Sequence, residues 1–416
     1  MTSLLASLGV PERLRTFGAS HQAAQARIDG VAPAAYARSR NALDGAVTGL
    51  SPYFTHGLVS LRDAARSVHH RHPLSFEDKL VFEFGWREFF HHVWAHQKNP
   101  DAILQDMHGR APWHGIYADE LPLDIRCGCT GVPAIDNAVR ILYATGYLHN
   151  HMRMWLASYV VHVRKVNWRA GADWLYGHLL DGDLPSNHLS WQWVAATFSS
   201  KPYLFNAENV MKYAPANART AWDCSDTVID QSYEALDDMA RNRAGVKAEL
   251  GSHAAVEEPA LLSHFYPLNS VEAKLILGQA AIDNIAKRHV ELVHPWGLSE
   301  RRANDQRADS LRIGIIHLPA HQAWPWSERR WRFVLDAMAA VTDSIWMGDL
   351  DQLDLTAAAS VSAQACLFPS YRQALARLAS LTPAPQLLPD PPMACRSFSK
   401  FYERARRDVA EFADLL

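Results

Sequence analysis

The segment Asp181-Gly182-Asp183-Leu184-Pro185-Ser186-Asn187-His188-Leu189-Ser190-Trp191-Gln192-Trp193 decides how this chain folds. Its glycine and proline mark a loop at 181–187. Asp181 and Asp183 stand among apolar residues, and an unpaired buried charge costs several kcal/mol, so these carboxylates need partners. Because Trp191 and Trp193 are two residues apart, their indoles point about 200° apart on a helix. The segment therefore predicts a loop with paired polar groups, followed by a helix with one buried indole and one that lines a cavity.

Helical patterns surround this segment. Ile135, Val139 and Leu142 keep i, i+4, i+7 spacing, which indicates one packed helix face. Residues 152–166 and 168–180 are expected to form two further helices. From about residue 20 to residue 290 the patterns are mostly helical, so this part of the chain is predicted to be mainly α.

Arg153 is the expected partner of the loop carboxylates, because a guanidinium can bind a carboxylate through two parallel hydrogen bonds. Asn150 and Met154 share its helix face, and Asn150 is a residue type that caps the start of a helix. The plain alternatives for these groups are a helix cap and two loop acids in solvent.

A further polar cluster lies in Glu83-Phe84-Gly85-Trp86-Arg87-Glu88-Phe89-Phe90. On a helix, Glu83, Trp86 and Arg87 share one face by i, i+3, i+4 spacing. Taken alone, this pattern also fits a surface ion pair beside a core aromatic residue. Only the combination of this cluster with the others points to a site.

A change of pattern near residue 300 predicts a second domain. Residues 297–310 are polar and aperiodic, so they are expected to be a linker. After them, short apolar runs at 311–318, 343–347, 365–368 and 385–388 alternate with helical patterns from 327 and at 371–381, and a last amphipathic helix is expected at 399–415. This alternation predicts a small parallel, Rossmann-like α/β domain at 311–416, after a helical domain at 1–296.

The composition limits the classes of function. The net charge of −3 gives no global basic field, so any contact with nucleic acid must come from a local patch, for which Arg164, Lys165, Arg169 and Lys201 are the candidates. Five scattered cysteines favour free thiols in a cytoplasmic protein and no metal or disulfide framework. No apolar window is long enough for a transmembrane helix, so no membrane partner is expected.

In order and spacing, the clusters resemble the FAD-binding domain of the cryptochrome/photolyase family. The matching residues span roughly 15–215: Leu50-Ser51-Pro52-Tyr53-Phe54, Gly57, Ser60, Trp86-Arg87-Glu88-Phe89, Gly131, Pro133, Asp136, Thr145-Gly146-Tyr147-Leu148-His149-Asn150, Met152-Arg153-Met154, Asp181-Gly182-Asp183, Asn187 and Trp191-Gln192-Trp193. The implied fold is a helical FAD-binding domain followed by the small C-terminal α/β domain. The implied cofactor is FAD, bent into a U inside a helical bundle.

The resemblance also implies roles for individual residues. Arg153 and Asp181 would form a salt bridge against the isoalloxazine ring, Asp183 would meet its polar edge, and Asn187 would neighbour N5. Asn187 is neutral and can hydrogen-bond a protonated N5. The remaining cofactor contacts would come from Tyr36, Thr48, Leu50, Ser51, Arg87 and Asn150, with the phosphates near a helix start.

For catalysis, the resemblance implies light-driven electron transfer from reduced FAD to pyrimidine dimers in DNA, which splits the dimer and returns the electron. The substrate mouth would be lined by Glu83, Trp86, Asn150, Met154 and Trp193, which would hydrogen-bond and stack on flipped bases. Trp191 and Trp168 would be the first two members of a tryptophan electron-transfer chain. Its surface member is open between Trp113, Tyr117 and Trp155.

Several residues depart from the family pattern. The chain begins almost directly in the helical domain without the usual N-terminal antenna domain, and His151 stands where repair enzymes commonly carry Arg. The segment 198–206 is also unlike the usual loop beside the lesion. These departures keep two alternatives open: a cryptochrome-like photoreceptor that signals to a protein partner through its C-terminal domain, and a light-independent flavin redox protein.

Overall fold

The computed structural model describes residues 2–97, 99, 103–107, 117–241, 245–246, 254–267, 271–278, 282–301 and 309–416. The chain divides into two compact units, each assembled from several segments. Unit 1 consists of Met1–Phe17, Ala32–Gly49 and Gln97–Ala260, and unit 2 of Gly18–Val31, Leu50–His96 and Leu261–Leu416. No helix in the described ranges is long and apolar enough to cross a bilayer.

Unit 1 is helical. Its helices are α1 (Thr2–Ser7), η1 (Glu12–Leu14), α3 (Pro33–Ser39), α7 (Leu123–Arg126), α8 (Pro133–Thr145), α9 (Asn150–Ser158), the π-helix η3 (Tyr159–Val163), α10 (Trp168–His178), α11 (Leu184–Ala195), α12 (Ala207–Tyr213), η4 (Arg219–Trp222) and α13 (Tyr233–Arg241). As the periodicity predicts, Ile135, Val139 and Leu142 of α8 are buried in its core. Gly146 ends α8 in the left-handed region, at φ +70°.

The helix expected at 152–166 differs in detail. It begins at Asn150, but His149 is the residue that caps it, with its ring accepting a hydrogen bond from the backbone N–H of His151 at 3.1 Å. Asn150 is thus the first helical residue rather than the cap. After Ser158 the α-helix passes into the π-helix η3, a local change of winding that residue periodicity does not reveal.

Unit 2 combines helices with a parallel sheet. Its helical elements are α2 (His21–Asp29), α4 (Ser51–Thr55), α5 (Leu61–Arg71), α6 (Lys79–Ala95), η5 (Glu272–Lys274), α14 (Leu318–Ala323), α15 (Glu328–Val341), η7 (Leu350–Gln352), α16 (Pro369–Leu378), α17 (Phe398–Ala405) and η8 (Phe412–Leu415). Its strands are β1 (Leu261–Leu262), β2 (Leu275–Leu277), β3 (His289–Val293), β4 (Ser310–His317), β5 (Trp326–Ser327), β6 (Ser344–Gly348), β7 (Ser360–Gln364) and β8 (Ser380–Thr382). β1 and β5 form a separate antiparallel pair.

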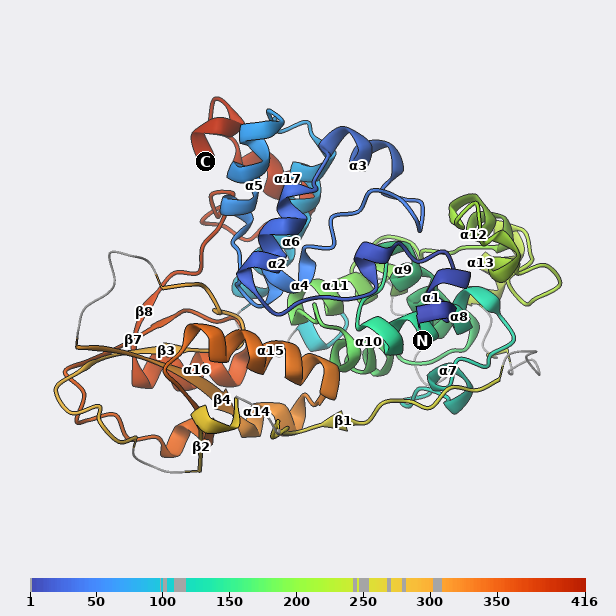
Figure 1. The fold of residues 1–416 in the computed structure, drawn as a ribbon. Helices are drawn as coiled ribbons and strands as arrows, with labels where there is room; N and C mark the ends of the chain where they lie inside the picture. Colours follow the sequence, from blue (N-terminus) through green and yellow to red (C-terminus); the bar gives the residue numbers. More distant parts are fainter. Residues whose placement is uncertain are drawn as a thin grey trace. The chain divides into compact units, whose positions relative to one another are not determined.

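The main sheet has the order β2-β6-β4-β3-β7-β8, and all of its pairs are parallel. The strands β6, β4, β3, β7 and β8, numbered in chain order from β3, run 3-2-1-4-5, which is the order of five of the six strands of a doubly wound sheet. Figure 1 shows β3, β4, β7 and β8 with α14, α15 and α16. Ile313, Ile315 and Ile316 of β4 are fully buried, as a central parallel strand requires. The parallel α/β expectation is therefore confirmed.

The boundaries of this part differ from those that the sequence indicates. β2 and β3 precede residue 297, so the sheet starts before the expected linker, and 297–310 connects two paired strands, with 302–308 outside the described residues. The third strand is β7 at 360–364, and 365–368 is a turn into α16. The run at 385–388 is not a strand, because the backbone N–H groups of Leu387 and Leu388 bond to Glu88 instead of to the sheet. The last helix ends at Ala405.

The carboxyl edge of the sheet is filled by the protein's own side chains. Where β3 and β7 end, His294 Nε2 lies 3.1 Å from the carbonyl oxygen of Gln364. Trp296 stacks on Phe368 with a centroid separation of 4.8 Å and contacts Tyr371 edge to face. In open α/β sheets, ligands bind at this point, where the strand order reverses. Here aromatic residues take that position.

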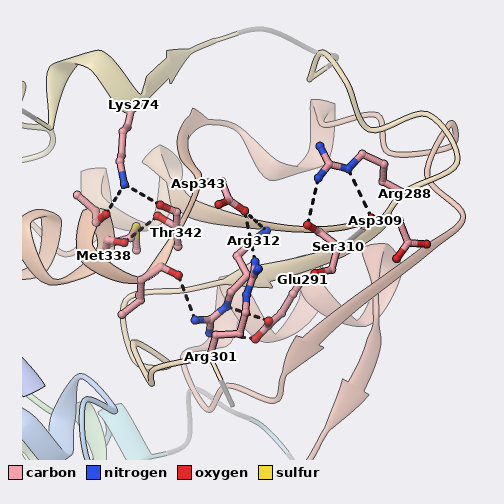
Figure 2. A network of polar contacts seen from close by, with 12 residues as sticks. Lys274, Arg288, Glu291, Arg301, Asp309, Ser310, Arg312, Met338, Thr342 and Asp343 are labelled. Carbon is pink, nitrogen blue, oxygen red and sulfur yellow. Dashed lines mark hydrogen bonds and ion pairs between the residues drawn. The ribbon is translucent and has the colours of Figure 1, made fainter. Parts of the chain in front are cut away.

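A buried arginine ties the other end of the sheet together (Figure 2). Arg312 of β4, whose side chain is 3% exposed, donates from Nη2 to Glu291 of β3 at 3.1 Å. Its Nη1 donates to the carbonyl oxygens of Ser299 and Val341, each at 3.0 Å. Its backbone N–H bonds to Asp343 at 2.8 Å. The guanidinium thus has a charged partner and two carbonyl acceptors that offset its desolvation.

Replacing Glu291 with Ala should destabilise unit 2 by about 1–3 kcal/mol, because it leaves the buried guanidinium of Arg312 without its carboxylate. The free energy of unfolding from urea titration measures this loss. Glu328→Ala is the matched control, since Glu328 and Arg332 form an exposed i, i+4 pair worth about 0.3–0.5 kcal/mol. Equal effects of the two substitutions would contradict the assigned importance of Arg312.

Candidate functional site

The ion pair expected at the 181–187 loop forms within unit 1. Arg153 Nη2 of α9 donates to Asp181 Oδ2 at 2.7 Å, and the side chain of Asp181 is only 2% exposed. The contact uses one guanidinium nitrogen rather than two, because Arg153 Nε donates to the carbonyl oxygen of Leu148 at 2.9 Å. The buried carboxylate therefore has a cationic partner that is itself held by the backbone.

Asp183 is the N-cap of α11. Its Oδ2 accepts hydrogen bonds from the backbone N–H of Ser186 at 3.1 Å and from the hydroxyl of the same residue. This cap fixes where α11 begins, and Asn187 follows within the first turn. The loop thus places the side chains of Asp181, Asp183 and Asn187 by hydrogen bonds rather than by packing alone.

Two indoles of the predicted electron-transfer chain are buried in unit 1. Trp191 of α11 is 2% exposed and Trp168 of α10 is 5% exposed, with its indole N–H donated to Asp106 at 2.8 Å. Trp193, by contrast, is 38% exposed and lies beside Tyr203. The opposite orientations expected for Trp191 and Trp193 are therefore present.

The surface end of the tryptophan chain is not identified. Trp113 lies outside the described residues. Trp155 is fully buried and donates its indole N–H to Asn209 at 3.1 Å, so it does not fit a surface position. Tyr117 is half-buried, and burial raises the pKa of its phenol to about 12.

Asn150 and Met154 share the predicted face of α9. Asn150 is exposed, and its Nδ2 lies 3.3 Å from the sulfur of Met154. The next residue, His151, is buried among aromatic rings, and burial lowers the pKa of its imidazole to about 4. His151 is therefore neutral at pH 7 and supplies no charge where repair enzymes carry Arg.

The proposed basic patch is only partly available. Lys165 is 3% exposed and donates to the carbonyl oxygens of Met239 and Ala240, at 3.0 and 2.7 Å. Arg164 is bound to Asp124, and Arg169 to Asp173. Lys201 is exposed. The inclusion of Lys165 in a DNA-binding face is wrong, because the helix C-terminus that it caps holds its ammonium group inside unit 1.

In unit 2, the predicted residues Glu83, Trp86 and Arg87 lie on α6. Arg87 Nη1 lies 3.4 Å from the hydroxyl of Thr55, at the end of α4. Trp86 stacks face to face on Phe398 of α17, with a centroid separation of 4.2 Å and an interplanar angle of 8°. One face of the predicted substrate-binding indole is thus covered by the C-terminal helix.

The remaining predicted cofactor residues are divided between the units. Leu50 is buried beside the first turn of α4, and Ser51 is the first residue of that helix, in unit 2. Tyr36 of α3 and Thr48 belong to unit 1, and both are half-buried. Leu50 and Ser51 therefore lie in unit 2, and Tyr36 and Thr48 in unit 1. The contacts of these four residues with a cofactor remain predictions.

The C-terminal segment is bound to α6 through side chains that the sequence did not single out. The two carboxyl oxygens of Glu88 accept hydrogen bonds from the backbone N–H groups of Leu387 and Leu388, at 2.6 and 2.8 Å. One turn later, His92 Nδ1 lies 2.6 Å from Asp390, and its Nε2 accepts the N–H of Cys395 at 2.9 Å. α6 therefore binds residues 387–395 through Glu88 and His92, which lie one turn apart on the same helix face.

His92, His96 and Asp390 lie close enough together to resemble a metal site. However, His92 Nε2 accepts a backbone N–H, so in the neutral ring Nδ1 must carry the proton that bonds Asp390. Both ring nitrogens of His92 are then engaged. The cluster is explained as a hydrogen-bonded attachment of the C-terminal segment, and no metal is assigned to it.

Sequence reasoning also missed the residues that position the α10 and α11 side chains. A Cβ atom on Gly171 would lie 2.4 Å from the ring of Trp191, so only glycine lets this indole pack against α10. The buried His188 pairs with the partly exposed Asp173 next to Asn187, with a separation of 2.8 Å between Nε2 and Oδ1. The position of His188, directly after a predicted site residue, was the available signal.

Replacing Gly171 with Ala should displace Trp191 and destabilise unit 1 by about 1–3 kcal/mol through overpacking. Near-ultraviolet circular dichroism and the free energy of unfolding measure the two effects. The control is Gly30→Ala, where the new Cβ would meet nothing closer than 3.5 Å. An unchanged tryptophan signal in Gly171→Ala would show that the indole is not packed as described.

Burial raises the pKa of the Glu88 carboxyl from 4.5 to about 7, although the N–H groups of Leu387 and Leu388 oppose the shift. Between these values the folded protein keeps a proton that the unfolded chain releases. The stability of unit 2 should therefore fall by about 2–4 kcal/mol as the pH rises from 4.5 to 7. This component should be missing from the pH profile of Glu88→Gln and kept in that of Glu77→Gln, an exposed acid. Parallel profiles for wild type and Glu88→Gln would contradict the assignment.

Part of this chain is similar in sequence to known photolyases and cryptochromes. Residues 80–274 match the family model described as the FAD binding domain of DNA photolyase. The deoxyribodipyrimidine photo-lyase of Streptomyces griseus is 37% identical over 152 residues, 36% of this chain and 32% of that protein. The cryptochrome DASH of Ostreococcus tauri is 34% identical over 192 residues, 44% of this chain and 35% of that protein. The aligned part is thus about a third of the length of these relatives.

Among solved structures, the cryptochrome of Synechocystis sp. PCC6803 has a TM-score of 0.42 and 24% identity, over 50% of this chain and 47% of that chain. An archaeal photolyase from Sulfolobus tokodaii, solved with two FAD molecules, has a TM-score of 0.41 and 23% identity over 53% of this chain and 50% of that chain. The segment that the family model matches contains the Arg153–Asp181 pair. Residues 80–274 of this chain are therefore similar to the FAD-binding domain of the cryptochrome/photolyase family.

Proposed function

We propose that this chain is a flavoprotein that uses blue light to drive electron transfer from reduced FAD to pyrimidine dimers in DNA. The observation that carries the proposal is the buried Arg153–Asp181 ion pair, at the start of a loop whose other polar side chains are held in place by their own hydrogen bonds. Because this loop lies inside a segment that matches an FAD-binding domain, we expect it to form the binding site of the flavin ring.

The side chains of this loop fit the chemistry of a flavin. An isoalloxazine ring has hydrogen-bond donors and acceptors along one edge and an apolar face. Arg153 offers a cation, Asp183 a carboxylate, and Asn187 an amide, which can donate or accept. Trp191 and the apolar core of unit 1 provide a buried environment next to them. The set therefore contains a counterpart for each kind of polar group on the ring.

Each residue has a separable task in this proposal. When bound, FAD supplies the light-driven one-electron chemistry that the side chains lack. Arg153 and Asp181 hold opposite charges beside the ring without adding net charge. Trp191 and Trp168 offer oxidisable indoles on the neighbouring helices α11 and α10. The protein thus binds, orients and screens the cofactor.

The proposed substrate contacts of unit 1 lie on α9 and α11. Trp193 and Asn150 are exposed in unit 1, with Met154 next to Asn150, which suits stacking and hydrogen bonding to extruded bases. For Glu83 and Trp86, on α6 of unit 2, a contact with the dimer is proposed separately.

A second function, a photoreceptor without repair activity, is favoured by the following observations. Trp86 is stacked on Phe398, so α17 covers one of the two indole faces on which a flipped base could stack. The buried, neutral His151 and the buried Lys165 also reduce the positive charge available for phosphate. In this case a change at the flavin would be passed to the C-terminal segment and on to a protein partner.

Asp181→Ala should lower the affinity for FAD by more than about tenfold, because it leaves the guanidinium of Arg153 without its buried partner. Titration of apoprotein with FAD, followed by flavin fluorescence, measures this change. Asp124→Ala is the control, since it removes another Arg–Asp pair of unit 1, the one with Arg164. If Asp181→Ala binds FAD as wild type does, the placement of the cofactor is wrong.

Repair of an ultraviolet-damaged oligonucleotide under blue light, with a dark control, separates the two functions. The first function predicts repair in light only, and a loss of repair in Glu83→Ala with FAD retained. Photoreduction of the flavin without repair would support the photoreceptor. A bound flavin that responds to neither light nor damaged DNA would contradict both and leave a light-independent redox role.

A further inference from the structure

The amide of Asn187 has a fixed orientation in unit 1. Its Nδ2 donates to the backbone carbonyl oxygen of Ala172 on α10 at 2.8 Å. Because a carbonyl oxygen can only accept, the atom at this distance must be the NH2 group and not Oδ1. The second N–H of Nδ2 points to Nδ1 of His188, at 3.4 Å. Within the part of the chain that the structure describes, no donor reaches Asn187 Oδ1.

His188 can accept that second N–H only in one of its two neutral forms. Its Nε2 lies 2.8 Å from Oδ1 of Asp173, and a carboxylate oxygen can only accept, so Nε2 carries the proton. Nδ1 is then unprotonated as long as the ring is neutral. Asp173 is held in turn by Arg169, whose Nε donates to both carboxylate oxygens, at 2.7 and 2.8 Å.

The surroundings keep this ring neutral. His188 is fully buried, and burial lowers the pKa of the imidazole more than Asp173 and the carbonyl of Leu184 raise it. The charge of Arg169 lowers it further. Trp168 and Tyr176 contact the ring edge to face and bring no charge. The pair therefore fixes a tautomer and does not act as a pH switch.

We infer that Asp173 and His188 are positioning residues that hold the Asn187 amide with Oδ1 turned toward the bound ligand as a hydrogen-bond acceptor. The inference rests on the proposed function, in which that ligand is the flavin and Asn187 neighbours N5. An acceptor at this place favours the reduced flavin, which carries hydrogen at N5, over the oxidised flavin, whose N5 is itself an acceptor. The three side chains would thereby raise the reduction potential of the cofactor.

Asp173→Asn tests the inference with little risk to folding, because the Asp173 side chain is 41% exposed and the replacement has the same shape. The guanidinium of Arg169 should donate to the amide oxygen of the new Asn side chain. The NH2 group of that side chain then faces His188. Nε2 must then accept, and Nδ1 takes the proton, for which the carbonyl oxygen of Leu184 is an acceptor. Nδ1 can then no longer accept the N–H of Asn187. The same substitution in a Ser-His-Asp triad likewise releases the wrong tautomer.

Two measurements on the full-length protein read this out. Nitrogen-15 NMR of the ring reports the His188 tautomer without any flavin, and a dye-coupled titration reports the midpoint potential of bound FAD. We expect the Nε2–H form in wild type, a shift toward Nδ1–H in Asp173→Asn, and a lower potential in that variant only. Asp237→Asn is the control, because Asp237 and Arg241 form an ion pair with the same i, i+4 spacing on α13.

An Nδ1–H tautomer in wild type overturns the inference, and so does a potential of Asp173→Asn equal to that of Asp237→Asn. Failure of the proposed function has a different signature, since a wild-type protein that takes up no FAD would refute the flavin site while the NMR result still reports the orientation of the ring. A shifted tautomer with an unshifted potential would show that Asn187 does not face N5.

Discussion

The burial of the Asp181 carboxylate is the constraint on which the site depends. Its side chain is almost inaccessible, so a cation must accompany it, and Arg153 does so from α9. That pairing sets the start of the 181–187 loop, after which Asp183 caps α11 and Asn187 is fixed against α10. The pairing of one desolvated charge thus accompanies a set of fixed polar groups on α9 and α11, and these are the groups proposed to meet the flavin.

Residue pattern predicted what depends on local spacing. The helix faces of α6 and α8, the parallel strands and the opposite exposures of Trp191 and Trp193 follow from periodicity. The residue pattern did not predict contacts between segments that are distant in the sequence. Leu387 and Leu388 look like a strand, but their N–H groups bond to Glu88, some 300 residues earlier. Gly171 is explained only by the ring of Trp191, which packs on it.

The C-terminal segment packs against α6, the helix that carries the predicted substrate residues Glu83 and Trp86. Glu88 and His92 bind residues 387–395 to α6, and Phe398 then covers one face of Trp86. At the sheet, Trp296, Phe368 and Tyr371 fill the place where doubly wound folds bind ligands. In both places, side chains of unit 2 pack against one another at positions where a ligand could otherwise bind.

The visible absorption spectrum of the purified full-length protein, taken after incubation with FAD and removal of free flavin, tests the central claim most directly. The account predicts a yellow protein whose flavin bands are shifted from those of free FAD, because the ring is buried next to Arg153, Asp181 and Asn187. A folded protein that remains colourless after this treatment would contradict it.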